Sequence, residues 1–505
     1  MVLLFTFGIF PIFYAAYVSL FKWRIRQGEY RGLENYVAAM GDVAYVFFGL
    51  IALGLIGLTI TTLYTAGKKA RENDIPIQYP LLALVPAAVT AVGMVLVLLR
   101  AVTIFAQSEE LLLGNALVGI LLIIVGSISS WLVQRYQHVK VAKTVHSVLP
   151  NFATPAITAV LTGGGAYYIA SYTIDQLNLS ERYPLAMVRI QYLVIALVVL
   201  AIGYIIWNWS MNQSSNIKLV GGLIGAIVMI GMGIQLASWW PTISGDSDAD
   251  FYLSLTATIF YALFTVPIQL LISMVLAVLL YQNIKAKGLF RIIFFIPYIA
   301  PAVATAGIFE AIFSIRATSL ANWPFTNGGQ DPTAALRWLQ EASPAFAKLG
   351  QAMGLDAATA IEWGPSLALF VIIIYSIWVF VGYDTVIFLA GLGNIPNTLY
   401  EAARIDGAGR WALFRYITLP LLSPTTYFLS VISIIGTFKA FNHIWVLREP
   451  AAQGTADTAS IYFFQTFFRG TRYGYATSMA VVLFVIILLM TIIQNRIAAR
   501  KVFYG

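Results

Sequence analysis

Long apolar stretches constrain the fold of this 505-residue chain more than any other feature of its sequence. The hydrocarbon core of a bilayer is about 30 Å thick, so a spanning helix needs about 20 apolar residues. Because a spanning backbone must satisfy its hydrogen bonds internally, we expect an all-α, polytopic membrane helix bundle with about 12 transmembrane helices. The candidate stretches are residues 2–21, 43–66, 80–106, 111–134, 148–174, 185–211, 219–240, 251–282, 289–314, 366–392, 425–447 and 475–494.

The composition excludes several classes of function. Only 10% of the residues are charged and 60% are hydrophobic, whereas soluble proteins carry about 25% charged residues. The absence of cysteine excludes disulfides and thiolate chemistry, and three scattered histidines do not suggest a metal site. No G-x-x-x-x-G-K-[ST] motif is present. We therefore expect no catalytic residue, no metal, no bound cofactor and no ATP hydrolysis by this chain.

The distribution of Lys and Arg predicts the orientation, because cytoplasmic loops keep the excess of positive charge. If the amino terminus lies inside, three cytoplasmic loops hold seven Lys or Arg residues and three outer loops hold only Arg182. The former are residues 67–79, 135–147 and 212–218, and the latter are residues 107–110, 175–184 and 241–250. Both termini are then cytoplasmic, and the net charge of +8 reflects topology and not a nucleic-acid partner. The first stretch lacks a basic start and a small-residue cleavage site, so we expect a retained span, with a coding start that could lie upstream.

Two predicted connections are longer than simple loops. The outer segment, residues 315–365, includes a predicted surface helix over residues 334–340. The inner segment, residues 393–424, predicts a helix that is capped by Asn394 or Asn397 and ends at Asp406, where Gly407 permits a turn. A second helix over residues 409–416 should end before Pro420, which breaks it ahead of the next span. Together these two short helices predict a protruding cytoplasmic knob.

The inner segment resembles a family motif. Glu401-Ala402-Ala403, Gly407, Ile417, Leu419 and Pro420 are similar to the EAA loop of ABC importer permeases, which has E-A-A, then G, then I-x-L-P at fixed spacing. Further positions resemble the carbohydrate-uptake, maltose-type branch of that family. They are residues 19–23, 32–36, 289–291, 297, 298, 301, 378, 382, 389–392, 395, 396, 438, 441 and 474–476. The resemblance covers residues 1–40 and 250–505 and implies a six-span permease core.

The resemblance implies that this segment couples transport to an ATP-hydrolysing subunit. The coupling residues implied are Glu401, Ala402, Ala403, Asp406, Gly407, Phe414, Leu419 and Pro420. The chain would then be the permease subunit of an ATP-driven importer, moving a sugar (an oligosaccharide, maltose- or trehalose-like or related) across the bacterial cytoplasmic (inner) membrane by alternating access. The implied partners are membrane lipid, a second permease in a heterodimer, an ABC ATPase dimer that holds ATP and Mg, and an extracytoplasmic solute-binding protein. The outer segment 315–365 is the expected docking surface for that protein.

Candidate substrate residues lie on two predicted spans. Ser430, Ser433, Thr437 and Phe441 recur at i, i+3, i+7 and i+11, which would form one helical stripe. Hydroxyls and aromatic faces suit sugars, although such Ser and Thr residues also pack between helices. The resemblance adds Val379, Phe380, Tyr383 and Ala440 to this set.

The remaining features divide the chain and leave alternatives open. Residues 1–42 are the expected first core span and outer loop, 251–505 hold the rest of the permease core, and 43–250 form an inserted set of six helices of unknown role. Asp384 and Lys439 lie within spans and should face the bundle interior, where they could pair or bind substrate. An ion-coupled secondary transporter of a small polar solute, with Asp384 as the coupling carboxylate, is the main alternative. An intramembrane enzyme acting on lipid-linked sugars would need an acidic or histidine cluster at one membrane face, and the sequence shows none.

Overall fold

The computed structural model describes residues 7–8, 10–72, 78–105, 113–140, 153–179, 183–211, 247–282, 285–354 and 363–501, together with single residues and short pieces between 221 and 233. The chain divides into two compact units, Met1–Ser247 (unit 1) and Asp248–Gly505 (unit 2). Nearly all of the described secondary structure is helical, as expected from the apolar stretches. The exception is one two-stranded antiparallel hairpin near the amino terminus.

Unit 1 consists of the hairpin and a set of long helices. Its elements are α2 (Phe10–Ser19), β1 (Phe21–Trp23), β2 (Gln27–Tyr30), α3 (Glu34–Met40), α4 (Val43–Glu72), α5 (Gln78–Phe105), α6 (Leu113–Lys140), α7 (Ala153–Leu179) and α8 (Tyr183–Met211). Helices α4 and α7 are joined by a 2.7 Å hydrogen bond between the hydroxyls of Thr59 and Thr162. The hairpin is joined to α7 by a 2.6 Å bond between the hydroxyls of Tyr30 and Tyr168.

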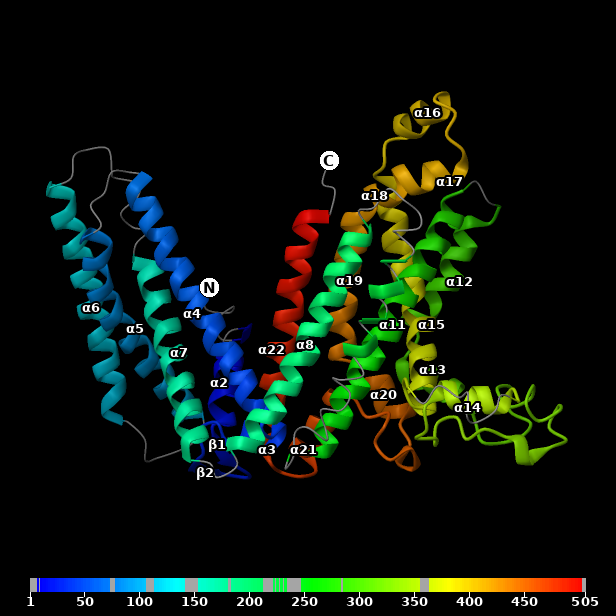
Figure 1. Ribbon diagram of the computed structural model, residues 1–505, viewed down its shortest axis with the longest axis horizontal. Helices are drawn as coiled ribbons and strands as arrows, with labels where there is room; N and C mark the ends of the chain where they lie inside the picture. Colours follow the sequence, from blue (N-terminus) through cyan, green and yellow to red (C-terminus); the bar gives the residue numbers. More distant parts are fainter. Residues whose placement is uncertain are drawn as a thin grey trace. The chain divides into compact units, whose positions relative to one another are not determined.

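In unit 2, α15 packs against α11, α12, α14, α19 and α20, and α22 packs against α19 and α21 (Figure 1). Its elements are α11 (Ala249–Tyr281), α12 (Lys287–Ile299), α13 (Ala302–Ile312), η3 (Pro332–Ala334), α14 (Ala345–Ala352), α15 (Leu367–Gly393), α16 (Asn397–Ile405), α17 (Arg410–Leu413), η5 (Phe414–Thr418), α18 (Leu419–Leu421), α19 (Ser423–Phe438), α20 (Asn442–Leu447), η6 (Pro450–Ala452), α21 (Ala459–Phe468) and α22 (Tyr473–Lys501).

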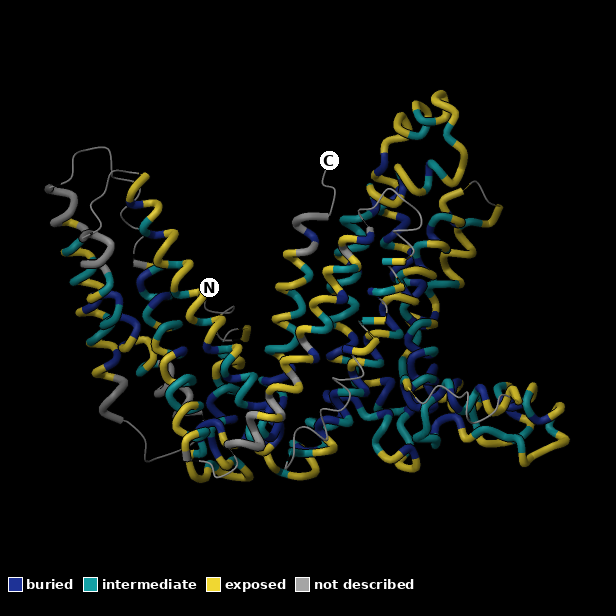
Figure 2. Tube along the Cα trace, in the orientation of Figure 1, coloured by how far each residue is buried: buried dark blue, intermediate teal, exposed yellow. Residues whose placement is uncertain are grey.

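Helix α15 is buried on most of its surface, as Figure 2 shows. A helix that is apolar all round is buried in the interior of a bundle or in a membrane. Two of its buried polar side chains, Ser376 and Asp384, are hydrogen-bonded to α11, which packs along it. The Tyr261 hydroxyl lies 2.7 Å from Ser376 Oγ, and Gln269 Nε2 donates to Asp384 Oδ2 over 2.6 Å. These two bonds satisfy polar groups that would be costly if they were buried alone.

The number of membrane spans is lower than expected in the part of the chain that is described. Four helices are long and apolar enough to cross a bilayer: Val43–Glu72, Ala249–Tyr281, Leu367–Gly393 and Tyr473–Arg496. Two bent pairs, with angles of 95° at α12–α13 and 59° where α18 meets α19, raise the number to at most six. The helical membrane fold is therefore confirmed, and the figure of 12 helices is not. Most of the expected stretch 219–240 lies outside the described residues.

The expected surface helix over residues 334–340 is wrong. The structure has a short 3-10 turn, Pro332–Ala334, followed by irregular backbone. The fully buried Asn322 accounts for the difference, because its side-chain oxygen accepts from the Leu336 backbone N–H and from Trp338 Nε1, both over 2.9 Å. Because the Leu336 N–H is bonded to Asn322, which lies earlier in the chain, it is not available for a helical hydrogen bond.

Gly382 allows α12 and α15 to approach closely, which yields a testable prediction. A Cβ at this position would lie 1.8 Å from the Phe294 carbonyl oxygen, a backbone atom that cannot rotate away. We expect Gly382→Ala to push the two helices apart and to destabilise the protein by about 1–3 kcal/mol or more. The measurement is the thermal midpoint of the purified protein in detergent.

Gly436→Ala on α19 is the matched control, because nothing lies within 4 Å of a Cβ built there. Alanine is the better helix former, so this variant should be neutral or slightly stabilised. Equal midpoints for the two variants would show that the α12–α15 contact is not as tight as described.

Candidate functional site

The segment 393–424, which we call the elbow, forms one end of unit 2 beyond α15 (Figure 1). It contains α16, α17, the turn η5 and α18. Helix α16 has no buried residue, and the tube in Figure 2 is largely exposed here. Three large apolar side chains are strongly exposed: Ile405 at 87%, Trp411 at 70% and Tyr416 at 73%. Exposed apolar patches mark contacts with another protein, a membrane or a ligand.

The corner of the elbow is built by Gly407. Its φ of +83° is a left-handed conformation that glycine adopts without steric cost. The Gly407 N–H donates to the Arg404 carbonyl, and the Ala408 N–H donates to the Ala403 carbonyl over 2.9 Å. These two bonds are the Schellman arrangement that ends a helix. The helix ends at Ile405 with Asp406 as its C-cap, so the expected end and the glycine turn are confirmed. The expected cap by Asn394 or Asn397 is wrong, because Pro396 precedes the helix and no side chain caps it.

Pro420 does not end the second helix, contrary to our expectation. The chain is helical from Arg410 to Leu421, and the 59° bend follows at the junction with α19. The turn η5 (Phe414–Thr418) is a π-helical turn, in which the Leu419 N–H donates to the Phe414 carbonyl. A proline clashes with the carbonyl four residues before it in an α-helix, and the wider π turn relieves this clash.

The two helices of the elbow are held together by a side-chain bond. The Tyr400 hydroxyl lies 3.0 Å from Thr418 Oγ1, and Thr418 also donates to the Leu413 carbonyl. The Tyr400 ring packs against the buried cluster that includes Leu392 and Ile395, at the carboxyl end of α15. These contacts connect α16 both to α15 and to the helix that leads into α19.

A hollow of about 640 Å³ lies between the elbow and the ends of α11 and α15. Glu401, Arg404 and Arg410 line it together with Phe414 and Tyr281. All eight predicted coupling residues lie on the elbow. Of these, Glu401, Ala402, Asp406, Gly407, Leu419 and Pro420 are exposed, and Ala403 and Phe414 are partly buried. Their coupling role stays a prediction.

The predicted substrate residues on α15 fall into two environments. Phe380 and Tyr383 face α12, where Tyr298 stacks on Tyr383 with ring centroids 4.6 Å apart and meets Phe380 edge-on at 5.9 Å. Val379 is buried in the main core cluster instead. Tyr298 was missing from the expected set, because the sequence does not show that a ring so far away along the chain stacks on Tyr383.

The expected stripe on residues 430–441 is only partly correct. Ser430, Ser433 and Thr437 lie on α19, but the helix ends at Phe438. Ser460 Oγ donates to the Phe438 carbonyl over 2.8 Å, which satisfies a carbonyl that the helix end leaves free.

Ala440 and Phe441 therefore lie beyond the helix, and Phe441 does not continue the stripe. Phe441 has φ −139° and ψ −62°, outside the helical region. Its ring stacks on Trp445, with centroids 5.5 Å apart.

The two intramembrane charges have separate surroundings. Asp384 is 1% exposed and accepts the hydrogen bond from Gln269, whereas Lys439 is exposed at the end of α19. Among the described residues, no ion pair joins them. Asp384 thus has a neutral partner on α11.

Known proteins share the region that carries the elbow. Residues 269–502 match the family described as binding-protein-dependent transport system inner membrane component. A curated relative, the arabinooligosaccharides transport system permease protein AraP of Halalkalibacterium halodurans, is 31% identical over 48% of this chain and 70% of its own length. This chain belongs to the family of binding-protein-dependent ABC transporter permeases.

Other members of the family match over a similar length. The probable ABC transporter permease protein YesP of Bacillus subtilis is 32% identical over 51% of this chain and 75% of its own length. The trehalose/maltose transport system permease protein MalF of Thermococcus litoralis is 28% identical over 50% of this chain and 76% of its own length. A crystal structure of a bacterial ABC transporter involved in the import of alginate is 22% identical over 56% of this chain and 95% of that chain, with a TM-score of 0.43.

The glycine at the elbow corner gives a second prediction. In Gly407→Ala the new Cβ meets open space, so the cost comes only from the left-handed backbone, about 1 kcal/mol. We expect a displaced or frayed α16 and reduced transport by the permease, with membrane insertion retained. Transport in proteoliposomes and protease sensitivity at the elbow would measure the two effects.

Gly409→Ala is the control on the same segment. Gly409 has φ −74° and ψ 170°, which alanine adopts readily, and its Cβ would also meet open space. Loss of transport in both variants to the same extent would contradict a special role for the left-handed turn.

Proposed function

We propose that this permease is the transmembrane subunit of an ATP-driven importer that moves a sugar across the bacterial cytoplasmic membrane by alternating access. The observation that carries the proposal is the exposed elbow, which holds the EAA pattern on an unburied helix at the end of the central span. Relatives named for arabinooligosaccharides and for trehalose or maltose support a sugar as the substrate.

The proposed assembly supplies what the chain does not contain. An ABC ATPase dimer holds ATP and Mg and receives the elbow, because the sequence has no nucleotide-binding motif of its own. A second, different permease completes the pathway, and a solute-binding protein delivers the sugar from outside. The elbow and both termini then lie in the cytoplasm, which agrees with the distribution of Lys and Arg.

The contacts of the elbow suggest how movement reaches the pathway. Closure of the ATPase dimer displaces α16, and Tyr400 passes the displacement to α15 and, through Thr418, toward α19. Helix α15 carries Gly382, where α12 is in direct backbone contact. Rigid movement of α15 therefore also moves α12, and the unit rocks between inward- and outward-facing states.

The proposed sugar pathway combines aromatic and hydroxyl side chains. Tyr298, Phe380 and Tyr383 offer ring faces, and Ser433 and Thr437 on α19 offer hydroxyls. Aromatic rings stack on the apolar faces of sugars, and hydroxyls bond their rims. Asp384 is hydrogen-bonded within the helix pair, and membership of a binding-protein-dependent family disfavours an ion-coupled mechanism.

A charge reversal on the elbow tests the proposed function. We expect Glu401→Lys to weaken ATPase association and to lower ATP-driven sugar uptake about tenfold or more, because a charge at an interface core is replaced by its opposite. The measurements are co-purification of the ATPase subunit and uptake into proteoliposomes.

Glu29→Lys, on the exposed strand β2, is the control for the change in net charge and should behave as wild type. Uptake by Glu401→Lys at the wild-type rate, with the ATPase still bound, would overturn the coupling role. Uptake by wild type that needs an ion gradient and no ATPase would overturn the proposed function itself.

The aromatic group gives a further prediction. Tyr298→Ala should lower sugar uptake about tenfold, because it removes a stacking face worth about 0.5–1.5 kcal/mol and leaves a gap beside Tyr383. Tyr298→Phe keeps the ring and should retain most of the activity. Both variants should still bind the ATPase, which co-purification would check. Equal sugar uptake by Tyr298→Ala and Tyr298→Phe would show that the ring does not line the pathway.

A further inference from the structure

A second hollow in unit 2 lies at the end opposite the elbow. It measures about 370 Å³ and is formed by the end of α13, residues 313–316, residues 339–340 and the end of α20. Figure 1 shows α13, α14 and α20 together at this end, with α16 and α17 at the other. The volume falls near the lower limit of small-molecule sites, about 300–1,000 Å³.

Polar groups converge on this hollow without satisfying one another. Glu310, Arg316, Gln340 and Glu449 line it. Among the residues that the structure describes, none of these three charged groups takes part in an ion pair. The nearby Arg448 does not add to the charge of the hollow, because Asp457 binds it through two bonds of 2.7 and 2.8 Å. The hollow therefore presents acceptors from two carboxylates and donors from a guanidinium and an amide.

The walls of the hollow are fixed by buried hydrogen bonds. Asn322, which is 0% exposed, bonds the Ser314, Arg316 and Leu336 carbonyls through Nδ2. Its Oδ1 accepts from the Leu336 N–H and from Trp338, so one side chain connects two wall segments. The backbone of these two wall segments is therefore held in place before a ligand binds, which lowers the entropy lost on binding.

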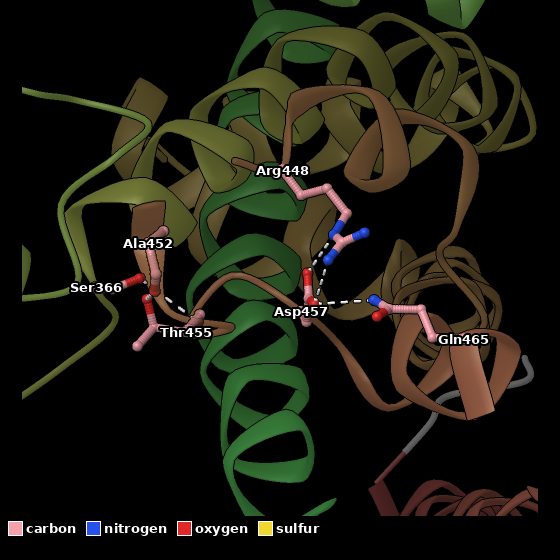
Figure 3. Close-up of polar contacts among 6 residues, drawn as sticks. All are labelled: Ser366, Arg448, Ala452, Thr455, Asp457 and Gln465. Atoms are coloured by element: carbon pink, nitrogen blue, oxygen red, sulfur yellow. Dashed lines mark hydrogen bonds and ion pairs between the residues drawn. The ribbon is translucent and has the colours of Figure 1, made fainter. Parts of the chain in front are cut away.

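The third wall is fixed by a separate group of bonds. Figure 3 shows Asp457 accepting from Arg448 and from Gln465, the latter over 3.0 Å. These bonds connect Arg448, which follows α20 and precedes Glu449, to α21.

We propose that this hollow is a receiving site for one sugar unit at the extracytoplasmic end of the permease, a proposal that rests on the proposed function. A sugar hydroxyl both donates and accepts, so carboxylates, a guanidinium and an amide together suit it. Phe313 and Leu339 supply apolar wall for the sugar ring. Two carboxylates against one guanidinium give the hollow a net negative charge, so the site takes a neutral sugar and disfavours a uronic acid.

Carboxylate labelling tests the proposal without requiring transport. The full complex of permeases and ATPase subunits, in nanodiscs and without the binding protein, is treated with a carbodiimide and an amine, and labelled residues are quantified by mass spectrometry. Excess maltose or arabinotriose should lower labelling of Glu310 and Glu449 at least twofold, whereas glucuronic acid should protect them less. Asp331, exposed on the same outer segment and outside the hollow, is the internal control.

Variants at two arginines make the test specific. Arg316→Gln should abolish the protection, and Arg337→Gln should keep it, because Arg337 is exposed on the same segment but does not line the hollow. Absence of protection by either sugar, an equal decrease at Asp331, or full protection in Arg316→Gln would overturn the proposal. None of these results would affect the proposed function, which fails only if wild type shows no ATP-driven sugar uptake.

Transport separates sugar capture from docking of the binding protein. With saturating sugar-loaded binding protein, Arg316→Gln should import sugar about tenfold more slowly, the loss expected for one charge-assisted hydrogen bond. ATP hydrolysis stimulated by the binding protein should remain, and Arg337→Gln should equal wild type in both assays. Joint loss of uptake and stimulated hydrolysis would show a docking contact instead, and unchanged uptake would also overturn the site.

Discussion

The close contact between α12 and α15 at Gly382 is the constraint on which the organisation of unit 2 depends. With no side chain at this position, the backbone of α12 lies directly against α15. This approach brings Tyr298 onto Tyr383 and fixes the aromatic group that lines the proposed pathway. Because α15 also ends at the elbow, one helix connects the surface proposed to meet the ATPase with the residues proposed to meet the sugar.

The elbow could be predicted from the sequence because its signals are local. Gly407 permits the left-handed backbone that commonly ends a helix, and the EAA spacing identifies the segment independently of its surroundings. The π turn before Pro420 could not be predicted in the same way. A proline signals a helix break, and only the structure shows that one wider turn lets the helix continue through it.

The errors at the other end of unit 2 share one physical cause. Residues 334–340 have helical composition, and the stretch through Phe441 has helical periodicity. In each case a polar side chain from another part of the chain bonds a backbone group. Asn322 accepts from the Leu336 N–H, and Ser460 donates to the Phe438 carbonyl. Such long-range bonds leave no trace in local patterns. The pairing of Tyr298 with Tyr383 was hidden for the same reason.

The hydrogen bonds of Asn322 have a consequence for how this chain can be altered. They connect residues 314–316 to residues 336–338 directly. Asn322 itself belongs to the turn between these segments, so part of this turn sets their mutual position. The glycine pair at 328–329, where both residues have positive φ, lies within that turn. Because residues other than glycine rarely adopt positive φ, a fluorophore or an affinity tag belongs on the exposed Gln330 beside this pair, where it replaces none of the side chains that hold the walls of the hollow.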